Sequence, residues 1–165
     1  MAGQVKPIPE GYHTVTPYLT LHDAARAIEF YKRAFDATER FRMEGPPGKI
    51  GHAELQIGDS IIMLGDEWPQ AGTRSPQSLG GTTSGLFLYV KDVDAAFSKA
   101  VAAGAKAETP PKDMFWGDRY GKLSDPFGHS WSLATHKEDV APEEMKKRMQ
   151  AEMAKMGQPK TSTAS

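Results

Sequence analysis

The sequence predicts an α+β fold in which two βαβββ modules are followed by a C-terminal helix. Within the 165 residues, the order of one strand, one helix and three strands occurs twice. Asp23 and Asp92 each stand directly before a helical pattern, where an aspartate is a good N-cap. A third helical pattern spans 142–156 without flanking strands. A repeat of this kind indicates two similar units packed about a pseudo-twofold axis.

The first module is expected over residues 12–68, after an irregular arm, 1–11, that is rich in glycine and proline. Tyr12–Leu21 alternates and predicts a strand, in which Pro17 indicates an edge or a bulge. A helix is predicted over Ala24–Ala34 because apolar residues recur there at steps of three and four. The remaining predicted strands are Thr38–Glu44, His52–Ile57 and Ser60–Leu64, the last two joined by a turn at Gly58-Asp59.

Residues 69–83 are mostly small and polar and predict a linker loop, which precedes a second module over 84–136. The predicted elements of this module are a strand at Gly85–Val90, a helix at Val93–Ala103, and strands at Ala105–Thr109, Arg119–Ser124 and Ser130–Thr135. Asp125-Pro-Phe-Gly128 has the composition of a β-turn between the last two strands. The second module therefore repeats the order of the first.

A helical extension is expected over 137–156, with its helix at Pro142–Met156. Four methionines form one apolar stripe on that helix: Met145, Met149, Met153 and Met156. Because methionine side chains adapt to many surfaces, the stripe can dock on the body of the protein or on a second subunit. The polar residues 157–165 are expected to form a flexible tail.

Composition and charge limit the classes of function. The net charge of −1 gives no electrostatic argument for a nucleic-acid partner. No apolar run approaches the roughly 20 residues that span a bilayer, and the first residues lack the pattern of a secretory signal. Cysteine is absent, which excludes disulfides, thiolate-bound zinc and a thiol nucleophile. We expect a cytoplasmic protein with neither a nucleic-acid nor a membrane partner.

Several sequence words in the two modules resemble one known group of proteins. They are Asp23-Ala-Ala-Arg-Ala-Ile-Glu-Phe-Tyr31, Asp92-Val-Asp-Ala-Ala-Phe97 and the closing Asp125-Pro-Phe-Gly-His129. Their order and spacing resemble the vicinal oxygen chelate superfamily of glyoxalase I, bleomycin-resistance proteins and extradiol dioxygenases. Thr16-Pro-Tyr-Leu19, His52-Ala-Glu-Leu55 and Phe115-Trp-Gly117 resemble its PhnB-like branch. The resemblance implies the glyoxalase/bleomycin resistance fold, with cup-shaped mixed sheets around a ligand site and commonly a homodimer.

The same resemblance implies positions for the ligands of a divalent metal in the metal-dependent members. They fall here on Thr16, Met63, Gly85 and Ser132, with serine where glutamate is common. None of these residues offers the imidazole, carboxylate or thiolate that such a metal binds, so we expect neither a metal nor another cofactor. The alternative is a non-standard divalent-metal site that starts from His52 and Glu54. These two share one face of a strand but fall short of three protein ligands.

Large aromatic residues suit a cavity that binds a flat organic molecule. Phe87 and Tyr89 share one face of their strand by the period of two. Arg119 is expected either to pair with Asp118 or to anchor a polar ligand. The candidate ligand-binding residues are Tyr18, Trp68, Phe87, Tyr89, Phe115, Trp116, Arg119, Tyr120 and Trp131.

The sequence therefore predicts a protein that binds or sequesters a small organic molecule, without a metal and without catalysis. No catalytic residue is predicted, because the chain has neither a thiol nor a Gly-x-Ser-x-Gly nucleophile elbow. The alternative is a metal-dependent lyase, isomerase or dioxygenase of the same superfamily, glyoxalase-like if a lyase. An interaction protein is a third possibility, which rests on the methionine-striped helix alone.

Overall fold

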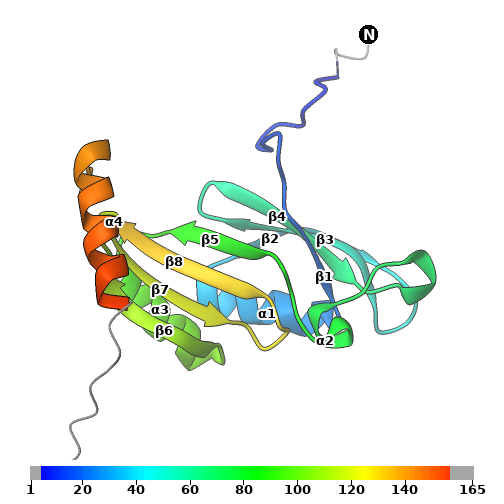
Figure 1. The fold of residues 1–165 in the computed structure, drawn as a ribbon. Helices are drawn as coiled ribbons and strands as arrows, with labels where there is room; N and C mark the ends of the chain where they lie inside the picture. The colour runs from blue at the N-terminus through cyan, green and yellow to red at the C-terminus, as the bar shows by residue number, and fades with distance from the viewer. Residues whose placement is uncertain (1–4, 157–165) are drawn as a thin grey trace, which may run out of the picture.

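The protein consists of two four-stranded mixed sheets with helices packed against them, in a computed structural model that describes residues 5–156 (Figure 1). The first module contains β1 (Tyr18–Leu21), α1 (Ala24–Phe35), β2 (Thr38–Glu44), β3 (Ile50–Ile57) and β4 (Ser60–Asp66). The second contains β5 (Gly85–Tyr89), α3 (Val93–Ala103), β6 (Lys106–Asp113), β7 (Asp118–Ser124) and β8 (Ser130–His136). The connection carries η1 (Pro69–Ala71) and α2 (Pro76–Leu79), and α4 (Pro142–Met156) follows the second module. The predicted α+β fold is confirmed.

The two sheets share one topology. The strand orders are β1-β4-β3-β2 and β5-β8-β7-β6. In each sheet the first strand of the module pairs in parallel with the last strand, and the other neighbours are antiparallel. Tyr18 lies opposite Met63 in the first parallel pair, and Phe87 lies opposite Ser132 in the second. The strand order of each sheet therefore confirms the predicted internal repeat.

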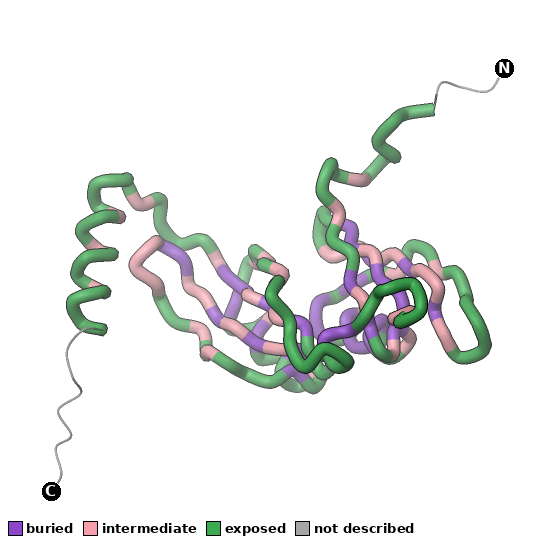
Figure 2. Tube along the Cα trace, turned by 45° about the vertical axis from the view of Figure 1, so that its right-hand side comes forward, coloured by how far each residue is buried: buried purple, intermediate pink, exposed green. Residues whose placement is uncertain are grey.

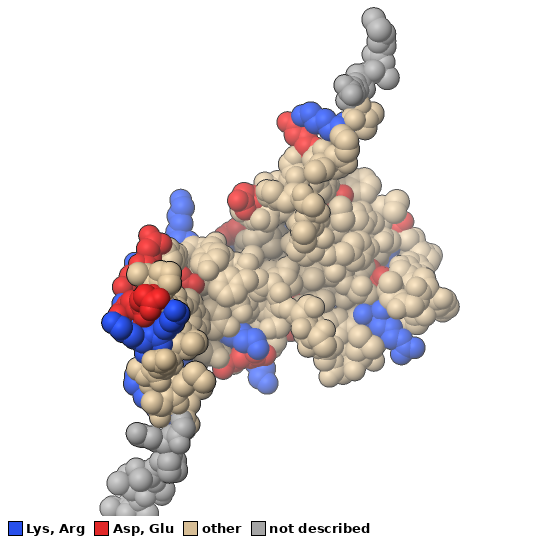
Figure 3. All heavy atoms as spheres, turned by 45° about the horizontal axis from the view of Figure 1, so that its top comes forward, with Lys and Arg blue, Asp and Glu red and all other residues tan. Residues whose placement is uncertain are grey.

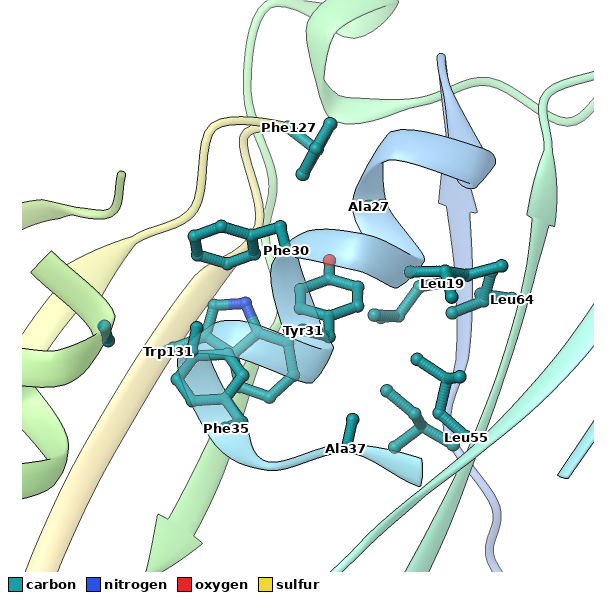
Figure 4. Close-up of a cluster of buried hydrophobic side chains, with 14 of the residues drawn as sticks. Leu19, Ala27, Phe30, Tyr31, Phe35, Ala37, Leu55, Leu64, Phe127 and Trp131 are labelled. Carbon is teal, nitrogen blue, oxygen red and sulfur yellow. The ribbon is translucent and has the colours of Figure 1, made fainter. Parts of the chain in front are cut away.

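The core lies between the sheets and the helices. Helix α1 packs on the first sheet, α3 packs on the second, and the two helices contact each other. Buried residues follow these contacts through the centre of the molecule, while α4 and the N-terminal arm are mostly exposed (Figure 2). Figure 4 shows that Tyr31 and Phe35 of α1 reach Trp131 of the second sheet, and the Phe35 and Trp131 ring centroids are 4.5 Å apart. One continuous core therefore joins both modules.

The β7–β8 turn forms a polar joint between the modules. The buried Asp125 carboxylate accepts hydrogen bonds from the Tyr31 hydroxyl at 2.7 Å and from Trp131 Nε1 at 2.8 Å. It also accepts the backbone N–H groups of Phe127 and His129, each at 2.9 Å. Burial, together with the Asp125 carboxylate, holds the pKa of Tyr31 well above its ordinary value. The aspartate expected only to start a turn thus also fastens α1 to the second sheet.

His129, which directly follows the turn, also belongs to this joint. Its ring is buried, and Nε2 lies 3.1 Å from the backbone oxygen of Thr20 on β1. The reason is that the turn folds back over the first module, where Phe127 packs against Phe30 and Tyr31. His129 therefore holds the turn against β1.

Two strands differ from their predicted bounds by more than two residues at one end. Strand β1 begins at Tyr18, so residues 12–17 of the predicted strand lie outside it. Strand β6 continues through Pro110-Pro111 to Asp113, beyond its predicted end. It can do so because β6 is the outer strand of its sheet, and its pairing with β7 is irregular between Thr109 and Lys112. The linker also contains two short helices where a loop was predicted.

Helix α4 has the bounds predicted for it but buries none of its residues. Arg148 anchors it by a two-pronged ion pair with Glu138, with both N···O distances at 2.8 Å. Acidic and basic side chains gather on this helix (Figure 3). Met145 is partly buried, whereas Met149, Met153 and Met156 are exposed, so within this chain most of the stripe does not dock on the body. The predicted tail 157–165 lies outside the described residues, and no helix within 5–156 is long and apolar enough to cross a bilayer.

Candidate functional site

Each sheet has one face that neither its helix nor the other module covers. Side chains alternate along β5, so Leu86 and Leu88 pack on the core while Phe87 and Tyr89 point away from it. Phe87 is 48% exposed and Tyr89 is 66% exposed. The shared face predicted for this pair is confirmed. We call these surfaces the first open face, on β1–β4, and the second open face, on β5–β8.

The second open face carries a cluster of four aromatic rings. The Phe87 ring centroid lies 5.0 Å from that of Tyr89 and 5.8 Å from that of Tyr120. Trp116, in the turn before β7, meets Tyr120 edge-on at 5.7 Å. Phe115 packs edge-on against Trp116 at 5.1 Å. Five of the nine predicted ligand-binding residues therefore lie together at one end of this face.

A buried carboxylate orients these rings. Asp118 Oδ2 accepts hydrogen bonds from the Tyr89 hydroxyl at 3.2 Å and from Trp116 Nε1 at 3.0 Å. Asp118 Oδ1 lies 2.8 Å from His136 Nδ1, and His136 Nε2 lies 2.9 Å from Asp139 Oδ1. Hydrogen bonds to both carboxylates raise the pKa of His136, that to Asp118 most. Desolvation, then the bond to Asp118, raises the pKa of Tyr89.

The other end of the second open face is polar. The Tyr120 hydroxyl lies 3.0 Å from Ser132 Oγ, which marks the boundary between the aromatic and polar ends. Beyond it, a groove of about 460 Å³ is lined by hydroxyl side chains and by Lys122. Lys122 Nζ is paired with Glu108 Oε2 at 3.1 Å. A ligand on this face would meet aromatic rings at one end and hydroxyl groups at the other.

The first open face holds the two donors of the alternative metal site. His52 Nε2 and Glu54 Oε1 are 3.4 Å apart on β3, and Glu54 also accepts a hydrogen bond from the Tyr12 hydroxyl of the N-terminal arm. The Tyr18 and Phe41 rings flank the His52 ring, with centroids 5.7 and 6.3 Å away. A groove of about 510 Å³ runs between β1 and β5, with Tyr18 and Phe87 on its walls. The two open faces are therefore neighbours along this groove.

Trp131 and Arg119 lie on the helix-covered face instead. The Trp131 side chain is fully buried against α1, because residues that alternate with the open-face positions of β8 point toward the helices. Arg119 pairs with Asp94 at 2.6 and 2.8 Å and with Asp113 at 3.1 Å. These bonds raise the pKa of the guanidinium further above its usual range. The predicted Asp118–Arg119 pair was wrong, since neighbours on a strand point to opposite faces.

The other two candidates occupy separate places. Tyr18 is 52% exposed on the first open face. Trp68 follows β4 and lies near Gly45, at the far end of the first sheet from the aromatic cluster. The sequence prediction missed Asp118 as an organising group and His136 as its partner. One signal could have found the aspartate: Asp118 and Tyr120 are two residues apart on a strand, so their side chains share one face.

The donor set does not fit the three-ligand metal site of the superfamily. Within residues 5–156, no three His, Asp or Glu side chains come together in an arrangement that could hold a metal ion. Over the same range, no buried side-chain nitrogen or oxygen lacks a hydrogen-bond partner, so none is left as an orphan donor. Only His52 and Glu54 pair on the first open face, and Tyr12 already engages the carboxylate.

Comparisons with known proteins agree with this architecture. The Glyoxalase/Bleomycin resistance protein/Dioxygenase superfamily matches residues 12–133. The uncharacterized protein Rv0887c of Mycobacterium tuberculosis is 47% identical over 141 residues, which is 84% of this chain and 83% of that protein.

Two solved structures share the fold. TioX from Micromonospora is 29% identical, with a TM-score of 0.59 over 75% of this chain and 98% of its own. The PhnB protein from Bacillus cereus is 20% identical, with a TM-score of 0.58 over 74% of this chain and 99% of its own. With two βαβββ modules, two open faces and this match over most of its length, the chain belongs to the glyoxalase/bleomycin resistance protein/dioxygenase superfamily.

Proposed function

We propose that this protein binds a small, flat organic molecule on the second open face, without a resident metal, and acts by sequestration. The observation that carries the proposal is the cluster of Phe87, Tyr89, Trp116 and Tyr120 on an uncovered sheet. Aromatic rings held in place lose little conformational entropy when a ligand stacks on them. Asp118 supplies that restraint for two of the four rings.

A homodimer is the second part of the proposal. Five large apolar or aromatic residues stay exposed on the two open faces: Tyr18, Phe41, Met43, Phe87 and Tyr89. Exposed apolar surface of this kind commonly marks a ligand or protein interface. A second copy related by a twofold axis would lay its first open face over the second open face of its partner, and would enclose two equal ligand sites.

Ligand-observed NMR with a panel of planar aromatic fragments tests the binding site. Fragments are expected to bind the wild type and to lose most of their affinity for the double variant Phe87→Ala/Tyr89→Ala. Val101→Ala is the matched control, because Val101 is a partly exposed apolar residue on α3, in the opposite layer. Fragments that bind the double variant as well as the control would contradict the proposed site.

The dimer is tested by sedimentation equilibrium. A mass twice that of the 18.0 kDa chain is expected, and Tyr18→Asp on the first open face should shift it toward the monomer. A wild-type chain that stays monomeric at high micromolar concentration would remove this part of the proposal while leaving the ligand site to stand.

The alternative function is a metal-dependent lyase, isomerase or dioxygenase of the same superfamily. The observation in its favour is the proximity of His52 and Glu54 on the first open face. Elemental analysis of protein purified without chelators discriminates the two functions. A stoichiometric metal that supports turnover, and that is lost in a folded His52→Ala/Glu54→Ala variant, would favour the enzyme.

A further inference from the structure

Resting on the proposed ligand site, we infer that the second open face selects a positively charged ligand, namely an aromatic molecule that carries an ammonium or other cationic nitrogen. The inference names the chemical class of the ligand. It follows from the four aromatic rings, from the carboxylate behind them and from the pairing of the cationic side chains on β5, β7 and β8.

The rings offer a surface of negative electrostatic character. An aromatic ring attracts a cation placed over its face within about 6 Å of its centroid, and tryptophan and tyrosine do so well. Phe87 and Tyr120 are inclined by 30° and Phe87 and Tyr89 by 43°, so their faces are not stacked flat on one another. With the exposed fractions of Phe87 and Tyr89, these angles leave ring faces open to a ligand.

Asp118 adds charge and orientation to these rings. The carboxylate is 4% exposed and accepts hydrogen bonds from both the Tyr89 hydroxyl and the Trp116 indole N–H. The phenol oxygen of Tyr89 therefore turns its lone pairs outward, where they can accept an N–H from a ligand. Because the carboxylate is buried, water screens its charge less than it would on an open surface.

His136 does not cancel this charge. Its imidazole lies between two carboxylates, those of Asp118 and Asp139. The cluster therefore keeps a net negative charge whether the imidazole is protonated or neutral. A ligand cation at the aromatic end of the face would be attracted in either state, because opposite charges attract more strongly near a protein surface than in bulk water.

On β5, β7 and β8, a ligand anion would find no cation without a carboxylate partner. All three cationic side chains on β5, β7 and β8 are paired with carboxylates: Arg119 with Asp94 and Asp113, Lys122 with Glu108, and His136 with Asp118 and Asp139. Arg119 also lies on the opposite face. On these three strands an anionic ligand would have to break one of these pairs, whereas a cation meets the rings without such a loss. On the outer strand β6, Lys112 lies opposite Tyr120 and carries a positive charge that an anion could use.

Three ligands with one ring system test the charge preference: 1-naphthylmethylammonium, 1-naphthylmethanol and 1-naphthoate. Their affinities are measured on the wild type by isothermal titration, with the Trp116 indole N–H signal in NMR reporting the place of binding. The ammonium is expected to bind about tenfold more tightly than the alcohol, and naphthoate the least. If the alcohol or naphthoate bound as tightly at the same site, the inference would fail while the proposed function stood. If none of the three bound, both would fail.

Two variants then assign the preference to its residues. Tyr89→Leu, at an exposed position, should reduce the affinity for the ammonium several-fold more than that for the alcohol. Asp118→Asn should erase most of the difference between the two ligands. Asp113→Asn is the control, since it removes a charge from the opposite face, where Asp113 pairs with Arg119. If both Tyr89→Leu and Asp118→Asn kept the wild-type preference for the ammonium over the alcohol, the inference would be overturned. If Asp118→Asn does not fold, the wild-type comparison and Tyr89→Leu decide the matter.

Discussion

The two open faces share one backbone topology but differ in how they hold their carboxylates. Glu54 on β3 is engaged by His52 of the same strand and by Tyr12, which lies in the segment before β1. Asp118 on β7 is engaged by Tyr89 and His136 of its own sheet and by Trp116 of the preceding turn. The carboxylate of the first face therefore has a partner in the segment before β1. The carboxylate of the second face has its partners within the second module.

The two modules are alike in the layers that support their sheets and differ on their open faces. The helix-covered sides of the two sheets are alike, with apolar residues packed on α1 and α3. On the open sides, an imidazole–carboxylate pair occupies one face and an aromatic cluster occupies the other. A change in the support that both faces share should therefore have a larger effect than a change on a single face.

The largest effect is expected for Asp125→Ala, which breaks the joint between the modules. The change leaves the Tyr31 hydroxyl, Trp131 Nε1 and two backbone N–H groups without their acceptor. Because each buried unsatisfied donor costs about 1–3 kcal/mol, we expect the free energy of unfolding to fall by about 4 kcal/mol or more. Urea denaturation measures it, and Asp59→Ala in the exposed β3–β4 turn should cost less than about 0.5 kcal/mol. Equal effects would show that the joint is not a main support.

Gly117→Ala should come next, because it disturbs the second open face at its turn. Gly117 has φ of +98°, and an added Cβ would lie 2.2 Å from the backbone oxygen of Glu138. We expect a loss of about 3 kcal/mol, of which the left-handed backbone alone accounts for about 1–2 kcal/mol. Gly48→Ala is the matched control, with φ of +80° and no neighbour within 4 Å of the added atom. Thermal unfolding compares the two variants. A similar loss of stability in both would mean that residues 137–140 can move away from the added Cβ at little cost.

A smaller difference is expected between Asp118→Asn and Glu54→Gln, which place the same change on the two faces. Asp118 is buried and accepts three hydrogen bonds, so the amide should cost about 2 kcal/mol. Glu54 is more accessible, and its change should cost about 1 kcal/mol or less. Urea denaturation measures both variants. A larger loss of stability for Glu54→Gln than for Asp118→Asn would show that the hydrogen bonds of Glu54 support the first face more than those of Asp118 support the second.

The smallest effect is the pH dependence that His136 gives to the second module. The folded state raises the pKa of this imidazole, so the folded protein binds the proton more tightly than the unfolded chain does. This contribution to stability is complete below the ordinary histidine value of about 6.5 and is lost as the pH rises through the raised pKa. Unfolding followed from pH 5 to 9 should show a decline that is absent in His136→Asn. A decline of equal size in that variant would place the titration elsewhere.

The sequence was enough to predict the fold and the strand faces, but not the contacts between distant segments. The period of two placed Phe87 and Tyr89 together, and the stripe of methionines gave the bounds of α4. The Asp118 cluster escaped prediction because its members come from β5, β7, β8 and the segment after β8. Trp131 was misplaced because its burial depends on how α1 crosses to the second sheet, which no local pattern encodes.

The two prolines in β6 have a consequence for how the chain behaves at high concentration. Proline carries no backbone N–H, so at Pro110-Pro111 the outer rim of the second sheet has no donor for an incoming strand. An exposed strand edge is otherwise a template for edge-to-edge aggregation. The two prolines therefore protect that rim against edge-to-edge association of copies.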